Sequence, residues 1–511
     1  MTGASTRTMA AVAGLVATIV SVSGSWIPSF WGDEAASIMS ARRPLSTLPE
    51  LLHTVDAVHG SYYVLLHFWI DLFGFSPVMA RLPSSIAIGI VAAGAVVLAQ
   101  QLAGRRAALF TAAVVVLLPR LTLVGTETRS FALSAALVIW ASVLLVAILG
   151  SASRPSARPI RHGLLWLLYA ALMTGASYLF LFAVLVLPAH AVVVALQWRR
   201  ARAKSTRGTR DRWIAPLSFL AAAVGTLIAL DPLIRLAIEQ RNQLDYLYER
   251  DAANPYAVLV TTWFGNPVYA ALAIAAMLLP LVAVLVHRAG GRPWLESARD
   301  DRGGPGIAAA VAIALTPMAL LLLLNIAVPV FTHRYLVGSA PAVAVLIGAT
   351  LARLRPRVAI AGVLLLTLAA LPSYVQQRTP FAKVGSDWAQ SAAIIHANAS
   401  PGDALVFDEL TPVSARPRLA QRVYPAEFTG LRNILLDVPY DENDYWWDRT
   451  YKVPTVAGRF ADVDTVWAVQ YRAPGSPPDQ YQMAELADLG FAVEQQWDCH
   501  SSVVYKLTRQ L

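Results

Sequence analysis

Residues 9–34 read MAAVAGLVATIVSVSGSWIPSFWGDE, an apolar block that is followed closely by two acidic residues. The block is long enough to cross a hydrocarbon layer, which is about 30 Å thick and takes about 20 apolar residues. Asp33 and Glu34 stand where a signal peptide would carry small residues for cleavage, and further apolar blocks follow. We therefore expect a retained membrane helix.

The rest of the chain repeats this pattern. Of its 511 residues 56% are hydrophobic and 14% are charged, which excludes an ordinary soluble or a disordered protein. The sequence predicts an α-helical polytopic membrane protein with about eleven transmembrane helices. We expect them at 9–29, 81–100, 107–125, 131–150, 163–178, 179–197, 213–231, 263–287, 307–329, 335–352 and 358–375.

The distribution of basic residues predicts the orientation. With a cytoplasmic N-terminus the inner loops carry twenty Lys and Arg, and the outer loops and helix ends before residue 376 carry nine. Basic residues favour the cytoplasmic side, so we expect the N-terminus inside and a multi-pass protein of the plasma membrane. The net charge of +9 then reflects these loops and does not indicate nucleic-acid binding. The single cysteine, Cys499, excludes an intramolecular disulfide and a thiolate zinc site.

Two domains are expected. Residues 1–375 form the transmembrane domain, with an external loop, 30–80, that carries juxtamembrane helices. Residues 376–511 form a small soluble α+β domain outside the cytoplasm, because the number of crossings is odd and the composition changes. Trp446 and Trp447 are either core residues of this domain or a sugar-stacking surface. Its expected elements are the helices Ser391–Ala399 and Tyr481–Leu489 and the strands Ala404–Phe407, Thr465–Gln470 and Ser502–Leu507.

Asp33 and Glu34 are the first candidates for chemistry. They are either first-turn acids, which stabilise a helix by under about 1 kcal/mol, or carboxylates whose basicity is raised by partial burial at the external membrane surface. The long external loop that follows predicts two amphipathic helices, one opening with a capping box at Thr47 and one over 62–73. Such a loop can wall a cavity for a lipid-linked substrate.

Polar groups gather on the same predicted face. Glu127 and Arg129 lie between the third and fourth spans, and His333, Arg334 and Tyr335 lie where the tenth begins. A guanidinium beside the exposed amides of a helix start favours an anionic phosphate. The alternative for His333 is an interfacial histidine without a ligand role. Loop 232–262 contains Arg235, Arg241 and Arg250. These arginines either join this group or extend toward the membrane boundary.

Five stretches carry a resemblance to a known family. They are Trp31-Gly32-Asp33-Glu34, the run from His59 to Trp69, Arg81-Leu82-Pro83-Ser84, the run from Glu127 to Leu133, and Arg334-Tyr335-Leu336. In order and sidedness they resemble the GT-C glycosyltransferases that use polyprenyl-phosphate sugars. The likeness is to the protein mannosyltransferase-like group (glycosyltransferase family 39) and its relative, the lipid A aminoarabinose transferase. The chain departs from that group at Gly60-Ser61, where prolines are common, and at Phe131, where tyrosine is common.

The resemblance implies an inverting membrane glycosyltransferase that moves a sugar, most readily mannose, from a polyprenyl-phosphate donor to an extracytoplasmic hydroxyl. A pentose is the other possibility, and the acceptor is a glycolipid, a polysaccharide or a protein. Asp33 would be the general base, and Glu34 or Glu127 would orient the acceptor or the base. Arg129, His333, Arg334 and Tyr335 would bind the donor phosphate, and His59, Glu127 and Arg241 would serve the acceptor or support the site. No nucleotide cofactor is expected, and no ligand spacing decides for or against a divalent metal.

Two other functions remain open. A transporter or flippase of lipid-linked sugars is expected to carry ionisable groups near the bilayer midplane. In this chain His190 and Asn325 are isolated exceptions, for which packing roles are expected, and the other candidates crowd one face. A structural scaffold with an external interaction domain would leave that one-sided cluster without a role.

Overall fold

The computed structural model describes residues 5–151, 159–203, 211–247, 252–288 and 303–510. Arg250 lies outside the described residues, as do residues 204–210 of the basic loop 199–212. The chain forms two compact units. The first unit comprises Met1–Ser23, Ala57–Tyr62 and Arg81–Val375, and the second unit comprises Gly24–Asp56, Tyr63–Ala80 and Gln376–Leu511.

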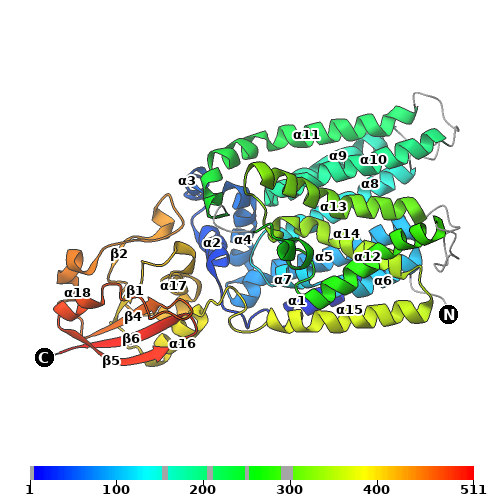
Figure 1. The fold of residues 1–511 in the computed structure, drawn as a ribbon. Coiled ribbons are helices and arrows are strands. Elements are labelled where there is room, and N and C mark those ends of the chain that lie inside the picture. The colour runs from blue at the N-terminus through cyan, green and yellow to red at the C-terminus, as the bar shows by residue number, and fades with distance from the viewer. Residues whose placement is uncertain (1–4, 152–158, 204–210, 248–251, 289–302, 511) are drawn as a thin grey trace. The chain divides into compact units, whose positions relative to one another are not determined.

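The first unit is a bundle of helices around one apolar core. Helix α8 packs on α9, α9 on α11, α10 on α13, and α14 on both α6 and α13 (Figure 1). Its helices are α1 (Thr6–Val22), most of α5 (Pro77–Ala103), α6 (Arg105–Val116), α7 (Pro119–Val124), α8 (Phe131–Ser151), α9 (Pro159–Leu179), α10 (Val186–Ala203), α11 (Asp211–Glu239), α12 (Pro267–Arg288), α13 (Gly303–Ala327), α14 (Ala340–Leu351) and α15 (Pro356–Gln376). Shorter turns connect them, namely η1 (Ala57–His59), η2 (Leu181–Leu185), η3 (Arg241–Leu247), η4 (Ala257–Thr261) and η5 (His333–Ser339).

Seven helices among the described residues are long and apolar enough to cross a membrane. They are Pro77–Ala103, Phe131–Gly150, Leu181–Arg200, Trp213–Glu239, Pro305–Ala327, His333–Leu351 and Pro356–Gln376. Thr6–Val22 and Pro267–Leu279 are shorter apolar helices. The remaining two expected crossings, 107–125 and 163–178, fall on the pair α6 and α7 and on the 21-residue helix α9. The chain is thus a polytopic helical membrane protein.

Two of the predicted spans are longer than the helices that the structure contains. Helix α1 ends at Val22, whereas the apolar block was expected to stay helical to residue 29. The expected span 107–125 is broken, because Leu118 is extended before Pro119, which begins α7. A proline disfavours helical backbone at the residue before it and lacks the N–H that would continue the helix.

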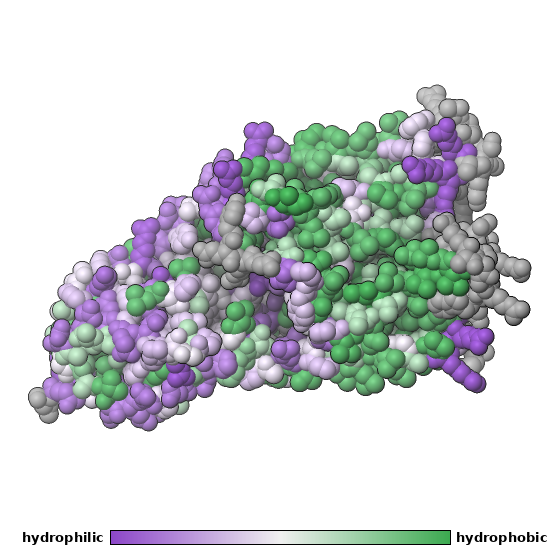
Figure 2. All heavy atoms as spheres, in the orientation of Figure 1, coloured by the Kyte–Doolittle hydropathy of each residue, from purple (hydrophilic) through white to green (hydrophobic). Residues whose placement is uncertain are grey.

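Small residues let the helices approach closely. A Cβ atom added to Gly348 on α14 would lie 2.6 Å from the backbone nitrogen of Thr111 on α6. Gly14 on α1 and Gly89 on α5 meet in the same way. Such contacts are a main source of helix association in lipid. The opposite faces of the outer helices are apolar and exposed, as Figure 2 shows over this unit; on α11 they present Leu217, Leu220, Val224, Leu227 and Ile228.

The second unit contains a four-stranded sheet in the order β1-β4-β6-β5. Strands β1 (Ala404–Phe407) and β4 (Thr465–Tyr471) are parallel, while β6 (Ser502–Arg509) is antiparallel to β4 and to β5 (Phe491–Asp498). Leu405 pairs with Trp467 on one face and Val406 with Ala468 on the other. Both faces are covered, which accounts for the unbroken apolar run of β1. The expected strands formed, but β5 was missed.

Helices and turns surround the sheet. Helix α16 matches the helix expected at 391–399, and α18 is shorter than the one expected at 481–489. Trp447 is buried and Trp446 packs against the same apolar cluster, so the tryptophan pair belongs to the core. The other elements are α16 (Trp388–Asn398), η6 (Val413–Ala415), α17 (Leu419–Val423), η7 (Pro425–Phe428), β2 (Leu436–Val438), η8 (Tyr440–Glu442), β3 (Arg449–Thr450), η9 (Val453–Phe460) and α18 (Met483–Asp488).

The second unit also includes most of the predicted external loop, 30–80, apart from residues 57–62. It takes in α2 (Gly32–Arg42), α3 (Leu48–Thr54) and most of α4 (Gly60–Phe73). Both expected amphipathic helices formed, but the capping box did not, because the Thr47 hydroxyl donates to the carbonyl of Pro44 at 3.1 Å. Phe30, Ile38 and Met39 enter the same apolar core as Trp388, Ile395 and Phe407.

Arg43 fixes the end of α2. Its side chain is fully buried, and its guanidinium donates to the carbonyl oxygens of Asn443 and Tyr445, both at 2.7 Å, and to that of Tyr440. The 440–445 segment therefore obtains partners for its backbone from a residue about four hundred positions earlier.

The close approach at Gly348 predicts the effect of a larger residue there. Gly348→Val should destabilise the first unit by about 1–3 kcal/mol, because the backbone of α6 has to move. The measurement is the thermal midpoint of the purified protein in mild detergent. Gly225→Val on α11 is the matched control, since a Cβ added there meets no heavy atom within 4 Å. Equal midpoints of the two variants would contradict the packing argument.

The Arg43 hydrogen bonds predict a second stability effect. Arg43→Met should lower the free energy of unfolding of the second unit by at least about 2 kcal/mol, because buried carbonyl oxygens lose charged donors. Limited proteolysis along a temperature ramp, with the fragments from residues 376–511 identified by mass spectrometry, reports the unfolding of this unit. Arg42→Met is the control, because Arg42 is exposed and makes one described hydrogen bond, to the carbonyl of Arg422 at 3.1 Å. The prediction is wrong if both variants unfold together with the wild type.

Candidate functional site

The loop 125–130, between α7 and α8, carries two of the candidate residues. Glu127 and Arg129 are both buried, with 6% and 8% of their surfaces exposed. The loop is tied to α5, because the Ser85 hydroxyl donates to the carbonyl of Gly125 at 2.7 Å and the Ser84 hydroxyl to that of Arg129 at 3.3 Å. Two charged side chains are therefore held inside the first unit on an irregular but fixed segment.

His59 lies against this loop. Its Nδ1 is 2.9 Å from the hydroxyl oxygen of Ser130, and its ring stacks on Phe180 and meets the edge of Phe131. Burial lowers the pKa of His59 well below its usual value, and the charge of Arg129 lowers it further. His59 is therefore neutral at ordinary pH, so one ring nitrogen can donate a hydrogen bond and the other can accept one.

An aromatic cluster connects these residues with the start of the tenth predicted span. The chain is extended at Phe180, between α9 and η2, which brings Phe180 and Phe182 beside Tyr335 of η5. The rings of Phe182 and Tyr335 are stacked with their centroids 4.3 Å apart. Arg129 lies over the ring of Phe131, 5.9 Å from its centroid. A small cavity opens among these rings, lined by Phe131, Ser134, Phe180, Phe182, Pro317 and Tyr335 together with other residues of η5.

Arg120 also belongs to this cluster, although the sequence analysis did not name it as a site residue. It is buried on α7, and its Nε donates to the carbonyl of Thr262 at 2.7 Å. It lies close enough to Glu127 and Arg334 to interact with their charges, and it also lies near His333. The available signal was an arginine directly after Pro119 inside an apolar run.

Arg81 is the second residue that was missed. It begins the quoted Arg81-Leu82-Pro83-Ser84 stretch, lies on α5 and is fully buried. A buried guanidinium has to be paired to be stable. Its presence shows that the first unit accommodates several buried positive charges near the 125–130 loop, to which the neighbouring Ser84 is bonded.

Asp33 and Glu34 lie in the first turn of α2, in the second unit. Glu34 is fully buried and Asp33 is half-buried. The position before them admits only glycine, because a Cβ atom on Gly32 would lie 2.3 Å from the carbonyl oxygen of Ser414. The backbone N–H of Phe30 donates to the hydroxyl of Tyr424 at 2.9 Å, which fixes the entry to the helix. The acidic pair therefore sits on a rigid first turn.

Other predicted residues lie apart from these clusters. Arg241 begins η3 with an exposed side chain. His190 is bonded to Ser142 and Tyr169, and the Asn325 side chain accepts from the backbone N–H groups of Val330 and Phe331, so both have the structural roles expected of them. Among the described residues no group of three or more His, Cys, Asp or Glu side chains is arranged to hold a metal ion.

The two clusters differ in chemistry. The cluster of the first unit combines buried guanidinium groups with aromatic rings, which suits an anionic group attached to an apolar body. The acidic pair of the second unit offers two neighbouring carboxylates in the first turn of α2, one buried and one half-buried.

No family model matches this chain, and no curated protein sequence matches it. Solved structures do. ArnT from Cupriavidus metallidurans bound to undecaprenyl phosphate is similar with a TM-score of 0.54 and 13% sequence identity over 97% of each chain. The apo state of the same protein is similar with a TM-score of 0.52 and 14% sequence identity, also over 97% of each chain. The apo Archaeoglobus fulgidus oligosaccharyltransferase gives 0.50 and 11%, over 90% of this chain and 69% of the other. The chain has the GT-C fold of these membrane proteins, as the resemblance predicted.

Proposed function

We propose that this protein is a membrane glycosyltransferase that moves a sugar from a polyprenyl phosphate to a hydroxyl group outside the cytoplasm, with inversion at the anomeric carbon. The observation that carries the proposal is the match over 97% of both chains to a structure bound to undecaprenyl phosphate. Mannose is the first donor sugar to test, and a pentose such as an arabinose derivative is the second. Glycolipids, polysaccharides and proteins are the acceptor classes.

The donor phosphate is assigned to the cluster of the first unit. Arg129 and Arg334 would neutralise the charge that grows on the phosphate as the bond to the sugar breaks, and His333 and Tyr335 would complete the site. Support comes from the burial of Arg129 and from the rings beside it, because a guanidinium interacts more strongly with an anion away from water. Glu127 and neutral His59 would orient groups at this site, and Arg241 would act from the periphery.

The role of general base is assigned to the acidic pair. Asp33 would take the proton of the acceptor hydroxyl while that oxygen attacks the anomeric carbon, and the polyprenyl phosphate would leave with the bonding electrons. Glu34, which is buried, would orient Asp33 or the acceptor. The rigid first turn of α2 supports this assignment, since a general base works only within hydrogen-bonding reach of its proton.

The base assignment is tested in washed membranes supplied with radiolabelled polyprenyl-phosphate mannose and, separately, a polyprenyl-phosphate pentose. Wild-type protein should form a labelled product, whose isolation identifies the acceptor. Asp33→Asn at equal abundance should form it about 10²- to 10⁴-fold more slowly, because it cannot accept a proton. Asp71→Asn, on the same external segment with an exposed carboxylate, should be fully active.

Full activity of Asp33→Asn would contradict the assignment of Asp33 as the general base. Movement of labelled lipid across the membrane, with no glycoside formed from either donor, would instead support a transporter of lipid-linked sugars.

The phosphate assignment is tested by inhibition with free polyprenyl phosphate. Arg129→Gln and Arg334→Gln should each weaken that inhibition by about tenfold or more, since each removes a charged hydrogen-bond donor. The inhibition of Arg129→Lys should be intermediate between that of wild type and that of Arg129→Gln, because lysine keeps the charge and lacks the planar guanidinium. Arg235→Gln is the control, because the exposed Arg235 pairs with Asp231 at 2.8 Å on its own helix. Unchanged inhibition of the folded Arg129 and Arg334 variants would contradict the assignment.

A further inference from the structure

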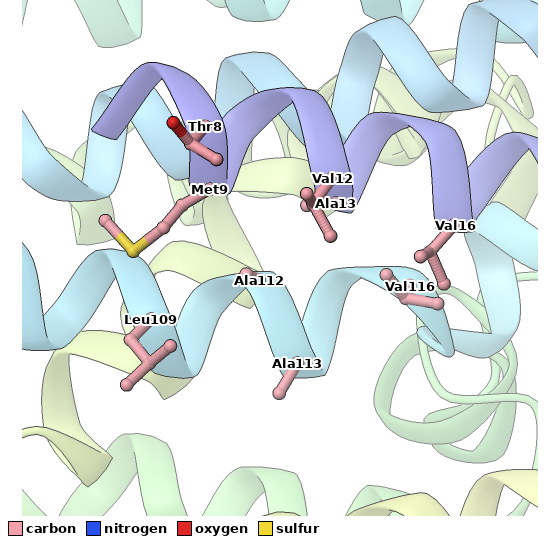
Figure 3. Close-up of a pocket in the computed structure, with 9 residues that line it drawn as sticks. All are labelled: Thr8, Met9, Val12, Ala13, Val16, Leu109, Ala112, Ala113 and Val116. Atoms are coloured by element: carbon pink, nitrogen blue, oxygen red, sulfur yellow. The ribbon is translucent and has the colours of Figure 1, made fainter. Parts of the chain in front are cut away.

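An open groove runs between α1 and α6 in the first unit (Figure 3). Its volume is about 390 Å³. The two helices lie side by side and run in the same direction, because Thr8 and Met9 are opposite Leu109 and Val16 is opposite Val116. Alanines leave the space between them, and the lining residues are Thr8, Met9, Val12, Ala13, Val16, Leu109, Ala112, Ala113 and Val116.

The groove is apolar and faces outward. Val12 and Leu109 are each 56% exposed, whereas other residues of α1 and α6 are buried in the bundle. Water in such a groove would find almost no hydrogen-bond partners, since Thr8 is the one polar residue in the lining. In a membrane protein, an elongated apolar groove of this kind fits a hydrocarbon chain.

Positive charge lies at one end of the groove. Arg7 directly precedes Thr8, and Arg105 lies one helical turn before Leu109, and both side chains are exposed. Because the helices are parallel, both arginines are at the same end, where the positive ends of both helix dipoles also lie. A basic pair next to a lipid-facing groove favours an anionic headgroup.

We propose that the α1–α6 groove binds one acyl chain of an anionic phospholipid, whose phosphate is held by Arg7 and Arg105. The site differs from the one assigned to the donor phosphate. Helix α6 leads away from Arg105 to α7 and the 125–130 loop, so the basic end of the groove and Arg129 lie toward opposite ends of α6. The lipid site does not depend on the transfer reaction.

Photocrosslinking of the wild-type protein tests the location. The protein is reconstituted with phosphatidylglycerol or phosphatidylcholine that carries a diazirine in the acyl chain, and the labelled peptides are mapped. Labelling by the phosphatidylglycerol probe should concentrate on residues 8–16 and 109–116 and exceed that by the phosphatidylcholine probe. Equal labelling by both probes, or labelling spread evenly over the lipid-facing helices, would overturn the proposal.

Variants test the two parts of the site separately. Native mass spectrometry counts the phosphatidylglycerol that stays bound through purification in mild detergent. Ala113→Leu should fill the groove, and Arg7→Gln with Arg105→Gln should remove the headgroup contacts. Each change should reduce retention about tenfold or more, the first because it fills the space for the acyl chain and the second because it removes two basic groups near the lipid surface.

Matched controls are available on α15 and directly before it. Ala361→Leu adds the same bulk at an exposed position, and Arg355→Gln with Arg357→Gln removes the same charge. Both controls should retain the lipid. The proposal fails if the controls lose as much lipid as the test variants, or if added polyprenyl phosphate displaces phosphatidylglycerol from the wild-type groove.

Discussion

The buried guanidinium of Arg43 is the interaction on which the second unit depends. Backbone carbonyl groups away from water require donors, and the 440–445 segment has no regular ladder to provide them. Arg43 supplies hydrogen bonds to three of these carbonyl oxygens. At the other end of α2, Gly32 lets the carbonyl of Ser414 approach closely. Residues 376–511 therefore share one core with a helix from the beginning of the chain.

This arrangement has a consequence for chemistry. The first turn of α2 carries Asp33 and Glu34, and that helix is fixed at both ends and buried along its length. A carboxylate on such a helix has few ways to move, which is what a group acting at a fixed distance needs. The same rigidity would have little value for acids that served only to stabilise a helix end, since that effect is worth under about 1 kcal/mol.

Much of the fold could be predicted from the sequence because lipid and strand pairing impose local patterns. Apolar blocks located most helices, and the runs at 404–407, 465–470 and 502–507 located three strands. The errors have physical causes. Pro119 broke a span whose apolar length was sufficient, and β5 was missed because its exposed residues hide its alternation. The burial of Arg81 and Arg120 could not be predicted, because each lies near the end of an expected span, from where an arginine side chain can also extend to the membrane boundary.

The short insertion 57–62 shows how distant sequence signals combine. Its flanking residues, Asp56 and Tyr63, belong to the second unit, and the Tyr63 hydroxyl donates to the Asp56 carboxylate. Asp56 has a φ of 57°, a left-handed conformation that aspartate tolerates better than most residues, and the bond to Tyr63 holds it there. The insertion itself belongs to the first unit, where Ser130 and Phe180 fix His59. The position of His59 within the first unit is thus determined by its contacts with Ser130 and Phe180, which account for a buried, neutral histidine on a loop that hydropathy alone would place at the surface.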